Sequence, residues 1–499
     1  MQNVDVKLMG FAPDMDITTV GACRYDVTIS TSFVPTVNGF EPMRDGDNAG
    51  FANLSDACTG AFAAKLVDGT TRLFAGTLSK INEGTSSFTW TDVSGAAYSS
   101  TLDNPWRFAQ FGNDTIATNR IDPVQMSRST GAFSNLAGTP PKASIVSVCQ
   151  GFVMLFNYND GTNDYADGWW CSALRNDGSW TPSIATQAAN GRLLDTQGGI
   201  TAAMPLGNVM VAYKNDSMYI GSYVGAPVIW DWQLVPGNVG CVSQEAIQTI
   251  IINDVPHHIF AGFDGFYLFD GSRPRFIGQG LKSWFNDNVP SQYRYRIRCL
   301  NDRYASNVIF FLPSGADISL KSGAAYNYRT ETWGYINGTE VYSVPIVYSS
   351  LGISYESLGT LYTTYDSLPT TISYDSPFWT SGSPIPAFFS NGTTLKTITG
   401  MRLPFSMLGN YTGTLDSYST IQRVRPRFNG YPTGAMACNV YYTANLGDTP
   451  LSVSASTLSN NKFDVMKSSK WFSPYFSTAG NVDLEIVGYT IYYEPDGEE

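Results

Sequence analysis

Histidine is nearly absent from this sequence of 499 residues, since His257 and His258 are the only two. Adjacent residues on a strand point to opposite faces, so these two rings cannot chelate one metal ion or relay one proton. A structural role, with one ring in the core and one exposed, is favoured over catalysis. The nucleophile motif G-x-S-x-G and the P-loop are also missing, which disfavours the enzymes that use them. We therefore predict no catalytic residues, no metal ligands and no cofactor.

Long hydrophobic runs are missing too. No run approaches the roughly 18 apolar residues of a membrane helix, and the first residues, MQNVDVKLMGFAPDMDITTVG, contain no apolar segment of signal-peptide length. We expect a chain that folds in a cytoplasm and does not insert into a membrane. The seven cysteines are far apart, odd in number and without CxxC spacing, so they are predicted to be reduced and mostly buried.

Basic residues are scarce. The chain has 30 Lys and Arg against 42 Asp and Glu, a formal charge of −12. This balance disfavours DNA binding that depends on neutralising phosphates. It is compatible with a surface past which DNA slides.

Aromatic residues, glycine and proline are plentiful, and they favour an all-β class. Residues 247–278, IQTIIINDVPHHIFAGFDGFYLFDGSRPRFIG, contain short apolar runs separated by Asn-Asp and Asp-Gly turns. The runs are too short for helices and are rich in Ile, Phe and Tyr. We interpret this stretch as a strand meander that forms one blade of a β-propeller.

Related strand–turn–strand units occur along the chain. Their turns centre on Gly112, Gly151, Gly207 and Asn253, at spacings of 39 to 56 residues, near the roughly 40–50 residues of known blade repeats. One blade cannot bury both of its faces, so the copies must close into a ring. The count predicts six or seven blades.

The remaining segments suggest the domain organisation. Residues 1–60 are broken by turn residues and predict an extended N-terminal arm, residues 61–400 the propeller, and residues 401–499 a smaller antiparallel β domain. Residues 348–376 are rich in Ser, Thr and Tyr and are expected to form an ordered surface ribbon. The best helix candidate is 279–286 (QGLKSWFN).

Acidic turn residues offer two weak alternatives for a site. Residues 159–167 (NDGTNDYAD) are dense in carboxylates but lack EF-hand spacing. Residues 172–180 (SALRNDGSW) resemble one Asp box of sialidase-like propellers, with one residue too few between Gly and Trp. Asp-Gly pairs also occur wherever turns are needed, so the turn interpretation is favoured for both.

Two arginine triplets stand out in this acidic chain: Arg294, Arg296 and Arg298, and Arg423, Arg425 and Arg427. At period two on a strand, each triplet places three guanidinium groups on one face. The simpler interpretation is pairing with neighbouring Asp and Glu. The sharper hypothesis is an interface with a neighbouring subunit, where arginine is enriched.

Many segments together resemble a family of phage structural proteins. They include GFAPDMDITTVG, LFAGTLSKI with FTWTDVSG, WRFAQFGNDTIATNRIDPVQ, FAGFDGFYLFDGSRPRFIG, AAYNYRTETWGYI, RVRPRFNG and VGYTIYYEPDGEE. The chain thus resembles, over nearly its whole length, the tail nozzle proteins of short-tailed phages, also called packaged-DNA stabilisation or tail hub proteins.

The resemblance implies a non-enzymatic virion component. Such a propeller subunit belongs to a ring, commonly a hexamer, that forms the lower DNA channel of the tail. Its partners would be copies of itself, the head-to-tail adaptor ring, fibres or spikes, and a plug or needle, while double-stranded DNA passes without sequence-specific binding. An acidic channel lining is the accompanying prediction. Two alternatives stay open: a carbohydrate-binding propeller of a tail tip or spike and, with less support, a propeller glycosidase.

Overall fold

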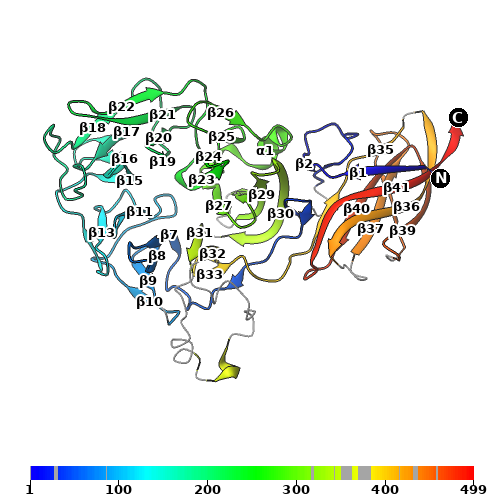
Figure 1. Cartoon of the computed structure of the whole chain (residues 1–499), viewed down its shortest axis with the longest axis horizontal. Coiled ribbons are helices and arrows are strands. Elements are labelled where there is room, and N and C mark those ends of the chain that lie inside the picture. Colours follow the sequence, from blue (N-terminus) through cyan, green and yellow to red (C-terminus); the bar gives the residue numbers. More distant parts are fainter. Residues whose placement is uncertain are drawn as a thin grey trace.

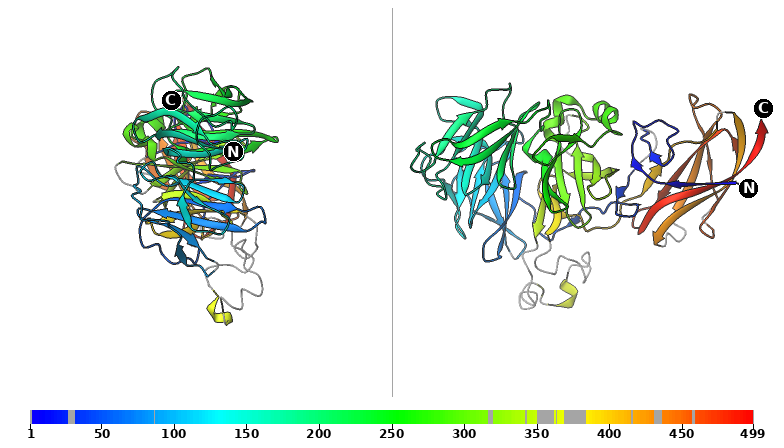
Figure 2. Two further views of the ribbon diagram at one scale, coloured as in Figure 1. Left: turned by 90° about the vertical axis from the view of Figure 1, so that its left-hand side faces the viewer. Right: turned by 45° about the horizontal axis from the view of Figure 1, so that its top comes forward.

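The computed structural model of the chain describes residues 2–26, 32–85, 87–315, 320–341, 343–349, 362, 364–368, 384–414, 416–430, 436–456 and 459–498. Two β-rich bodies follow one another along the long axis, a ring-shaped propeller and a β-sandwich, and both chain ends lie at the sandwich end (Figure 1). Figure 2 shows the two bodies from further directions. The all-β propeller fold is confirmed, and the described strands give it seven blades.

Each blade is a four-stranded antiparallel sheet, and six blades are continuous in sequence. Blade 1 contains β7 (Cys58–Lys65), β8 (Thr71–Thr77), β9 (Ile81–Gly84) and β10 (Trp90–Asp92); blade 2 contains β11 (Arg107–Phe111), β12 (Asp114–Thr118), β13 (Gln125–Ser127) and β14 (Phe133–Asn135); blade 3 contains β15 (Lys142–Cys149), β16 (Phe152–Asn159), β17 (Asp164–Cys171) and β18 (Ala189–Arg192). Blade 4 contains β19 (Ala202–Leu206), β20 (Val209–Tyr213), β21 (Met218–Gly225) and β22 (Ile229–Leu234); blade 5 contains β23 (Ile247–Ile252), β24 (Val255–Ala261), β25 (Phe266–Phe269) and β26 (Pro274–Phe276); blade 6 contains β27 (Arg298–Asp302), β28 (Asn307–Leu312), β29 (Leu320–Asn327) and β30 (Thr332–Val341). The first strands of most neighbouring blades contact one another, so they line the axis of the ring.

The seventh blade closes the ring with strands from both sides of the other six. It contains β31 (Ser343–Ser349), β32 (Pro384–Ser390), β33 (Thr394–Thr397) and, as its outer strand, β6 (Asp47–Asn48). Lys396 and Thr397 of β33 pair with Asn48 and Asp47 of β6. Because β6 precedes blade 1 in sequence, this pairing joins the beginning of the propeller to its end.

The predicted turn positions are confirmed. Gly112, Gly151, Gly207 and Asn253 all have positive φ, between 49° and 80°, and each lies in the turn between the first two strands of its blade. Glycine and asparagine tolerate this conformation better than other residues. The meander predicted at residues 247–278 is blade 5.

The sandwich consists of two facing antiparallel sheets. One sheet has the order β39 (Phe463–Ser469), β36 (Ser417–Gly430), β41 (Leu484–Glu498), β5 (Phe40–Glu41) and β4 (Val34–Pro35), with β1 (Gln2–Lys7) also paired to β41. The other has the order β34 (Ser406–Leu408), β40 (Trp471–Thr478), β37 (Met436–Thr443) and β38 (Leu451–Ser454), with β35 (Thr412–Gly413) paired to β40. Buried side chains such as Ile421, Val424, Val440 and Phe476 fill the space between the sheets.

The segment expected as an N-terminal arm contributes strands to both bodies. Its strands β1, β4 and β5 complete the sandwich, and β6 completes the propeller. Frequent turn residues keep all of these except β1 to two residues each, so they pair at the edges of sheets formed by later parts of the chain. The Ser/Thr/Tyr-rich ribbon, residues 348–376, lies largely outside the described residues, with a short 3-10 helix η3 (Tyr365–Ser367) within it.

The junction between the two bodies is filled with aromatic rings. Phe11 is 1% exposed, and its ring centroid lies 5.1 Å from that of Trp284 and 5.1 Å from that of Tyr335. Asp14 accepts hydrogen bonds of 2.6 and 2.9 Å from backbone N–H groups at the start of α1 (Lys282–Asn288). Such buried ring contacts stabilise one relative placement of the bodies.

The predicted helix at 279–286 corresponds to α1, displaced by two or three residues. Among the described residues, no helix has the length and hydrophobicity needed to span a membrane. All seven cysteines are free and buried, as predicted.

Candidate functional site: a closed propeller axis and a cationic sheet face

The first arginine triplet is not on a strand. Arg294 and Arg296 lie in the 3-10 helix η2 (Ser291–Arg296), and only Arg298 begins a strand. The prediction of three guanidinium groups on one strand face is therefore wrong here. The sequence YRYRIRC alternates like a strand, but a 3-10 helix has three residues per turn, so its side chains at period two point in different directions.

Arg294 is an internal residue. Its side chain is 4% exposed and donates hydrogen bonds to the backbone carbonyls of Val289 and Phe263 and to Asn286 Oδ1. Its guanidinium also lies 4.9 Å from the ring centroid of Phe285. This arginine joins α1 to blade 5 and is covered within the monomer.

Arg298 belongs to an ion-pair network on the propeller axis. Glu245, in the 3-10 helix η1 (Gln244–Ala246) before blade 5, accepts hydrogen bonds of 2.6 and 3.1 Å from Arg107 of blade 2. Arg298 of blade 6 lies 3.7 Å from the same carboxylate, and Arg107 also donates to Ser144 of blade 3. Blades 2 and 5 are as far apart as two blades of a seven-blade ring can be, so their contact crosses the axis.

Electrostatics keep this network charged. Burial raises the pKa of Glu245, but the nearby Arg107 and Arg298 outweigh it and lower the pKa to about 2. Burial lowers the pKa of Arg298, and Glu245 opposes that effect. The three side chains are between 9% and 15% exposed. A buried carboxylate with two cationic partners therefore closes the axis where the innermost strands begin.

Arg296 makes a second contact across the ring. It lies 3.8 Å from Asp103, in the segment before blade 2, and Tyr295 Oη donates a 3.0 Å hydrogen bond to the same carboxylate. η2 thus extends from blade 6 toward blade 2, beside the first network. The simpler sequence interpretation, pairing with neighbouring acids, is confirmed for Arg296 and Arg298, but these acids are distant in sequence.

One histidine lies in the core, as the sequence predicts, and the other is half-buried where an exposed ring is predicted. His258 is fully buried; its Nδ1 accepts from Tyr213 Oη at 2.7 Å, and its Nε2 donates to the Pro205 carbonyl at 3.1 Å. Burial lowers its pKa to about 4, despite the opposing hydrogen bond to Pro205. His257 is half-buried and bonds to the Val255 carbonyl.

The acidic turns have structural roles. Asp160 accepts backbone hydrogen bonds within its own turn, and Asp164 and Asp167 pair with Arg120 and Arg192. Among the described residues, no three His, Cys, Asp or Glu side chains converge as metal ligands would.

The segment that resembles an Asp box closes a local turn. Trp180 is 2% exposed, and its indole N–H donates to the Asp177 carbonyl at 2.7 Å. Its ring is therefore part of the core of blade 3 and not a surface for stacking on a sugar.

The second arginine triplet has the predicted strand geometry. Arg423, Arg425 and Arg427 alternate on β36 with the buried Val424 and Pro426, so all three point outward from the sandwich. The two triplets thus have the same spacing in sequence but opposite exposure.

Neighbouring strands add further cations to this surface. Arg427 of β36 lies opposite Gly488 of β41, and Gly488 lies opposite Lys7 of β1. Arg427 and Lys7 are therefore in register on the same face of the sheet. Lys462, at the start of β39, lies 5.4 Å from the ring centroid of Tyr492, the residue opposite Arg423. The cationic sheet face consists of Lys7, Arg423, Arg425, Arg427 and Lys462. It also carries the carboxylates of Asp5, Asp464, Glu485, Glu494 and Asp496, so its formal charges balance.

Two arginines of the cationic sheet face have partners within the monomer. Arg423 pairs with Asp464 at 2.7 Å, and Arg427 donates to the Val6 carbonyl at 2.8 Å. At Gly488, an added Cβ would lie 2.5 Å from Arg427 Nη2 and 2.3 Å from the Val6 carbonyl oxygen. Glycine at this position therefore allows β1 and the arginine to pack against β41.

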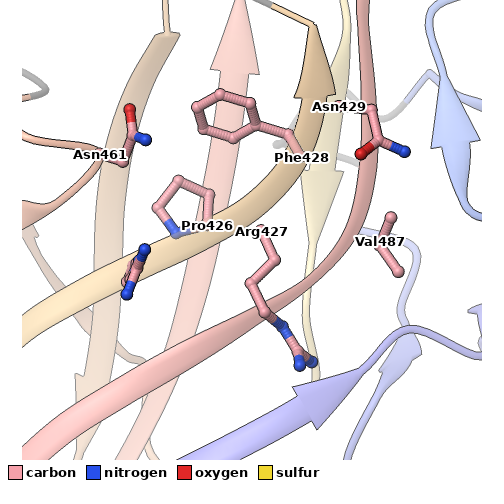
Figure 3. Close-up of a pocket in the computed structure, with 7 residues that line it drawn as sticks. Pro426, Arg427, Phe428, Asn429, Asn461 and Val487 are labelled. Carbon is pink, nitrogen blue, oxygen red and sulfur yellow. The ribbon is translucent and has the colours of Figure 1, made fainter.

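Arg425 is the exception on this face. Within the part of the chain that the structure describes, it makes no hydrogen bond or ion pair at the distances expected of one. It borders a hollow of about 250 Å³ that is also lined by Pro426, Arg427, Phe428, Asn429, Asn461 and Val487 (Figure 3). An exposed guanidinium beside a hollow is suited to binding a carboxylate.

Comparisons with known proteins concern the fold alone. No family model matches the sequence, and no curated protein sequence matches it. Similar solved structures include apo AztD from Citrobacter koseri (10% identity, TM-score 0.35, 58% of this chain and 78% of that one) and the Neurospora crassa Pan2 WD40 domain (9% identity, TM-score 0.37, 69% and 90%). Another is BBS1N in complex with ARL6DN (10% identity, TM-score 0.31, 57% and 96%). At these values the similarities carry no information about function.

Sequence reasoning missed Arg107 and Glu245. The two residues are 138 positions apart, and neither belongs to a charge cluster. Only closure of the ring brings them together.

Proposed function

We propose that this chain is a structural, non-enzymatic subunit of a ring in a bacteriophage tail, a nozzle or hub that retains the packaged genome and conducts it during ejection. The proposal starts from the resemblance to tail nozzle proteins along nearly the whole sequence. The ring, commonly a hexamer in the proteins that the chain resembles, would contact the head-to-tail adaptor on one side and fibres, spikes or a plug on the other. It would be assembled in the host cytoplasm and remain in the virion.

The structural observation that carries the proposal is the closed propeller axis. The contact of Arg107 with Glu245 spans the ring of blades, so a duplex cannot pass through a single subunit. A DNA channel must therefore be enclosed by several copies, with each propeller forming part of the wall. The formal charge of −12 per chain supports this role, because like charge keeps a duplex from adhering to the wall.

The test is the symmetry of the full-length protein in negative-stain electron microscopy. The proposal predicts rings with a central hole wide enough for a duplex, and little binding of linear duplex DNA at physiological salt. Isolated propellers or trimers would contradict it, and would favour the carbohydrate-binding alternative.

A further inference from the structure

Two segments that connect the propeller to the sandwich lie side by side. Residues 41–48 lead from β5 of the sandwich to β6 of blade 7, and residues 396–403 lead from β33 of blade 7 toward β34 of the sandwich. The two segments are antiparallel. Between β6 and the sandwich, backbone hydrogen bonds of 2.8 to 3.1 Å join them: Leu403 to Met43, Asp45 to Met401, and Gly400 to Asp45. We call these two segments the bridge.

Apolar packing fixes the bridge to the propeller. Met43 is 3% exposed and belongs to a core cluster that contains Phe388 of blade 7 and Ile309 of blade 6. A Cβ added at Gly46 would lie 2.6 Å from Phe388 Cζ. The bridge therefore rests directly on blade 7, at a distance that only glycine allows.

Arg402 joins the bridge to the sandwich. Its side chain is 14% exposed and donates hydrogen bonds of 2.8 Å to Glu41 and 2.8 Å to Asp483, which directly precedes β41. It also donates a 2.9 Å hydrogen bond to the Pro42 carbonyl. One guanidinium thus holds both segments of the bridge against the sandwich. Charge-assisted hydrogen bonds of this kind are strong, and the planar guanidinium fixes their directions.

We propose that the bridge is a locked hinge, in which Arg402 holds the propeller and the sandwich at one angle. Relative motion is the usual behaviour of two bodies joined by a flexible linker, but two hydrogen-bonded segments resist bending. Without the Arg402 side chain, the aromatic contacts at the junction remain, and the bodies can rotate about them. The locked hinge goes beyond the proposed function, because it is a property of a single chain.

Distance measurements between the two bodies test the lock. Val255→Cys in blade 5 and Met466→Cys in the sandwich place spin labels at positions that are 48% and 73% exposed. The seven native cysteines are buried, so the labels attach to the introduced ones. Double electron-electron resonance of the full chain should give one narrow distance distribution when Arg402 is present. Arg402→Ala is expected to broaden it at least twofold.

Two further variants serve as controls. Arg402→Lys keeps the charge but cannot make the same three hydrogen bonds, so an intermediate width is expected. Arg44→Ala removes an exposed cation from the same bridge, where its guanidinium donates only a 3.4 Å hydrogen bond to the Gly400 carbonyl. This variant should leave the distribution unchanged. Hydrogen exchange in β16 and β36 shows whether each body stays folded.

The outcomes separate the locked hinge from the proposed function. An unchanged width in Arg402→Ala with both bodies folded would overturn the inference, and so would equal broadening in Arg44→Ala. A broad distribution with Arg402 present would also overturn it. If Arg402→Ala unfolds either body, the width in Arg402→Lys decides. None of these results depends on whether microscopy shows rings, because the distances are measured within one chain in dilute solution.

Discussion

The two arginine triplets have the same spacing in sequence and opposite positions in the structure. Arg294, Arg296 and Arg298 point in different directions and find partners within the chain. Arg294 joins α1 to blade 5, Arg296 contacts Asp103, and Arg298 lies at the propeller axis beside Glu245. Arg423, Arg425 and Arg427 turn outward, because β36 alternates them with core residues of the sandwich. Spacing alone therefore does not distinguish a buried charge network from an exposed surface. Burial decides what each arginine contributes to stability.

The largest expected effect is on the propeller axis. Glu245→Ala leaves Arg107 and Arg298 buried without their shared carboxylate, which should lower the free energy of unfolding by about 3–5 kcal/mol. Urea denaturation followed by tryptophan fluorescence measures this loss. Glu331→Gln removes an ion pair whose two side chains are more than half exposed and should cost less than about 1 kcal/mol. Equal losses of unfolding free energy in the two variants would contradict the expectation that a buried ion pair contributes more to stability than an exposed one.

The next effect is the pH dependence caused by His258. Its pKa is about 4 in the folded chain, against 6.5 for an ordinary histidine, so between these pH values the unfolded state binds more protons. The free energy of unfolding therefore does not depend on His258 above pH 6.5. It falls by about 3 kcal/mol through this residue as the pH drops to 4. Unfolding free energies measured across this range should show the slope in the wild type and in His257→Gln. A slope that persists in His258→Gln would assign it to other groups.

A smaller effect is expected where β1 meets the cationic sheet face. Gly488→Ala places a methyl group against the Val6 carbonyl and the Arg427 guanidinium. Either β1 or the arginine must move, at a cost of about 1–3 kcal/mol. Gly447→Ala, at a position where an added Cβ meets nothing within 4 Å, is the matched control in the same domain. Thermal melts that do not differ between the two variants would mean that β1 adjusts freely.

The smallest effects are expected in the exposed triplet. Arg423→Ala removes an exposed ion pair with Asp464 and should cost about 0–1 kcal/mol. Arg425→Ala, which breaks no contact of that kind, should stay within about 0.5 kcal/mol of the wild type. Chemical denaturation of a dilute sample is the appropriate measurement. A loss above 2 kcal/mol in Arg425→Ala would place this side chain among those that hold the monomer together.

The sequence by itself determined the local features of the fold. Short apolar runs separated by Asn-Asp and Asp-Gly predicted the meander of blade 5, and the turn residues Gly112, Gly151, Gly207 and Asn253 do adopt positive φ. Alternation predicted that one of the two histidines lies in the core, and it placed Arg423, Arg425 and Arg427 on one face. These features depend on neighbouring residues alone, because turn conformation and strand alternation are properties of a few consecutive positions.

Only the tertiary structure decided which distant residues meet. It pairs β6 with β33 to close the seventh blade, and it brings Glu245 to Arg107 across the axis. It also gives the first arginine triplet partners within the chain, although its spacing equals that of the second. These contacts join residues far apart in the chain, and packing of complete blades around a common axis fixes them, so no short sequence pattern encodes them.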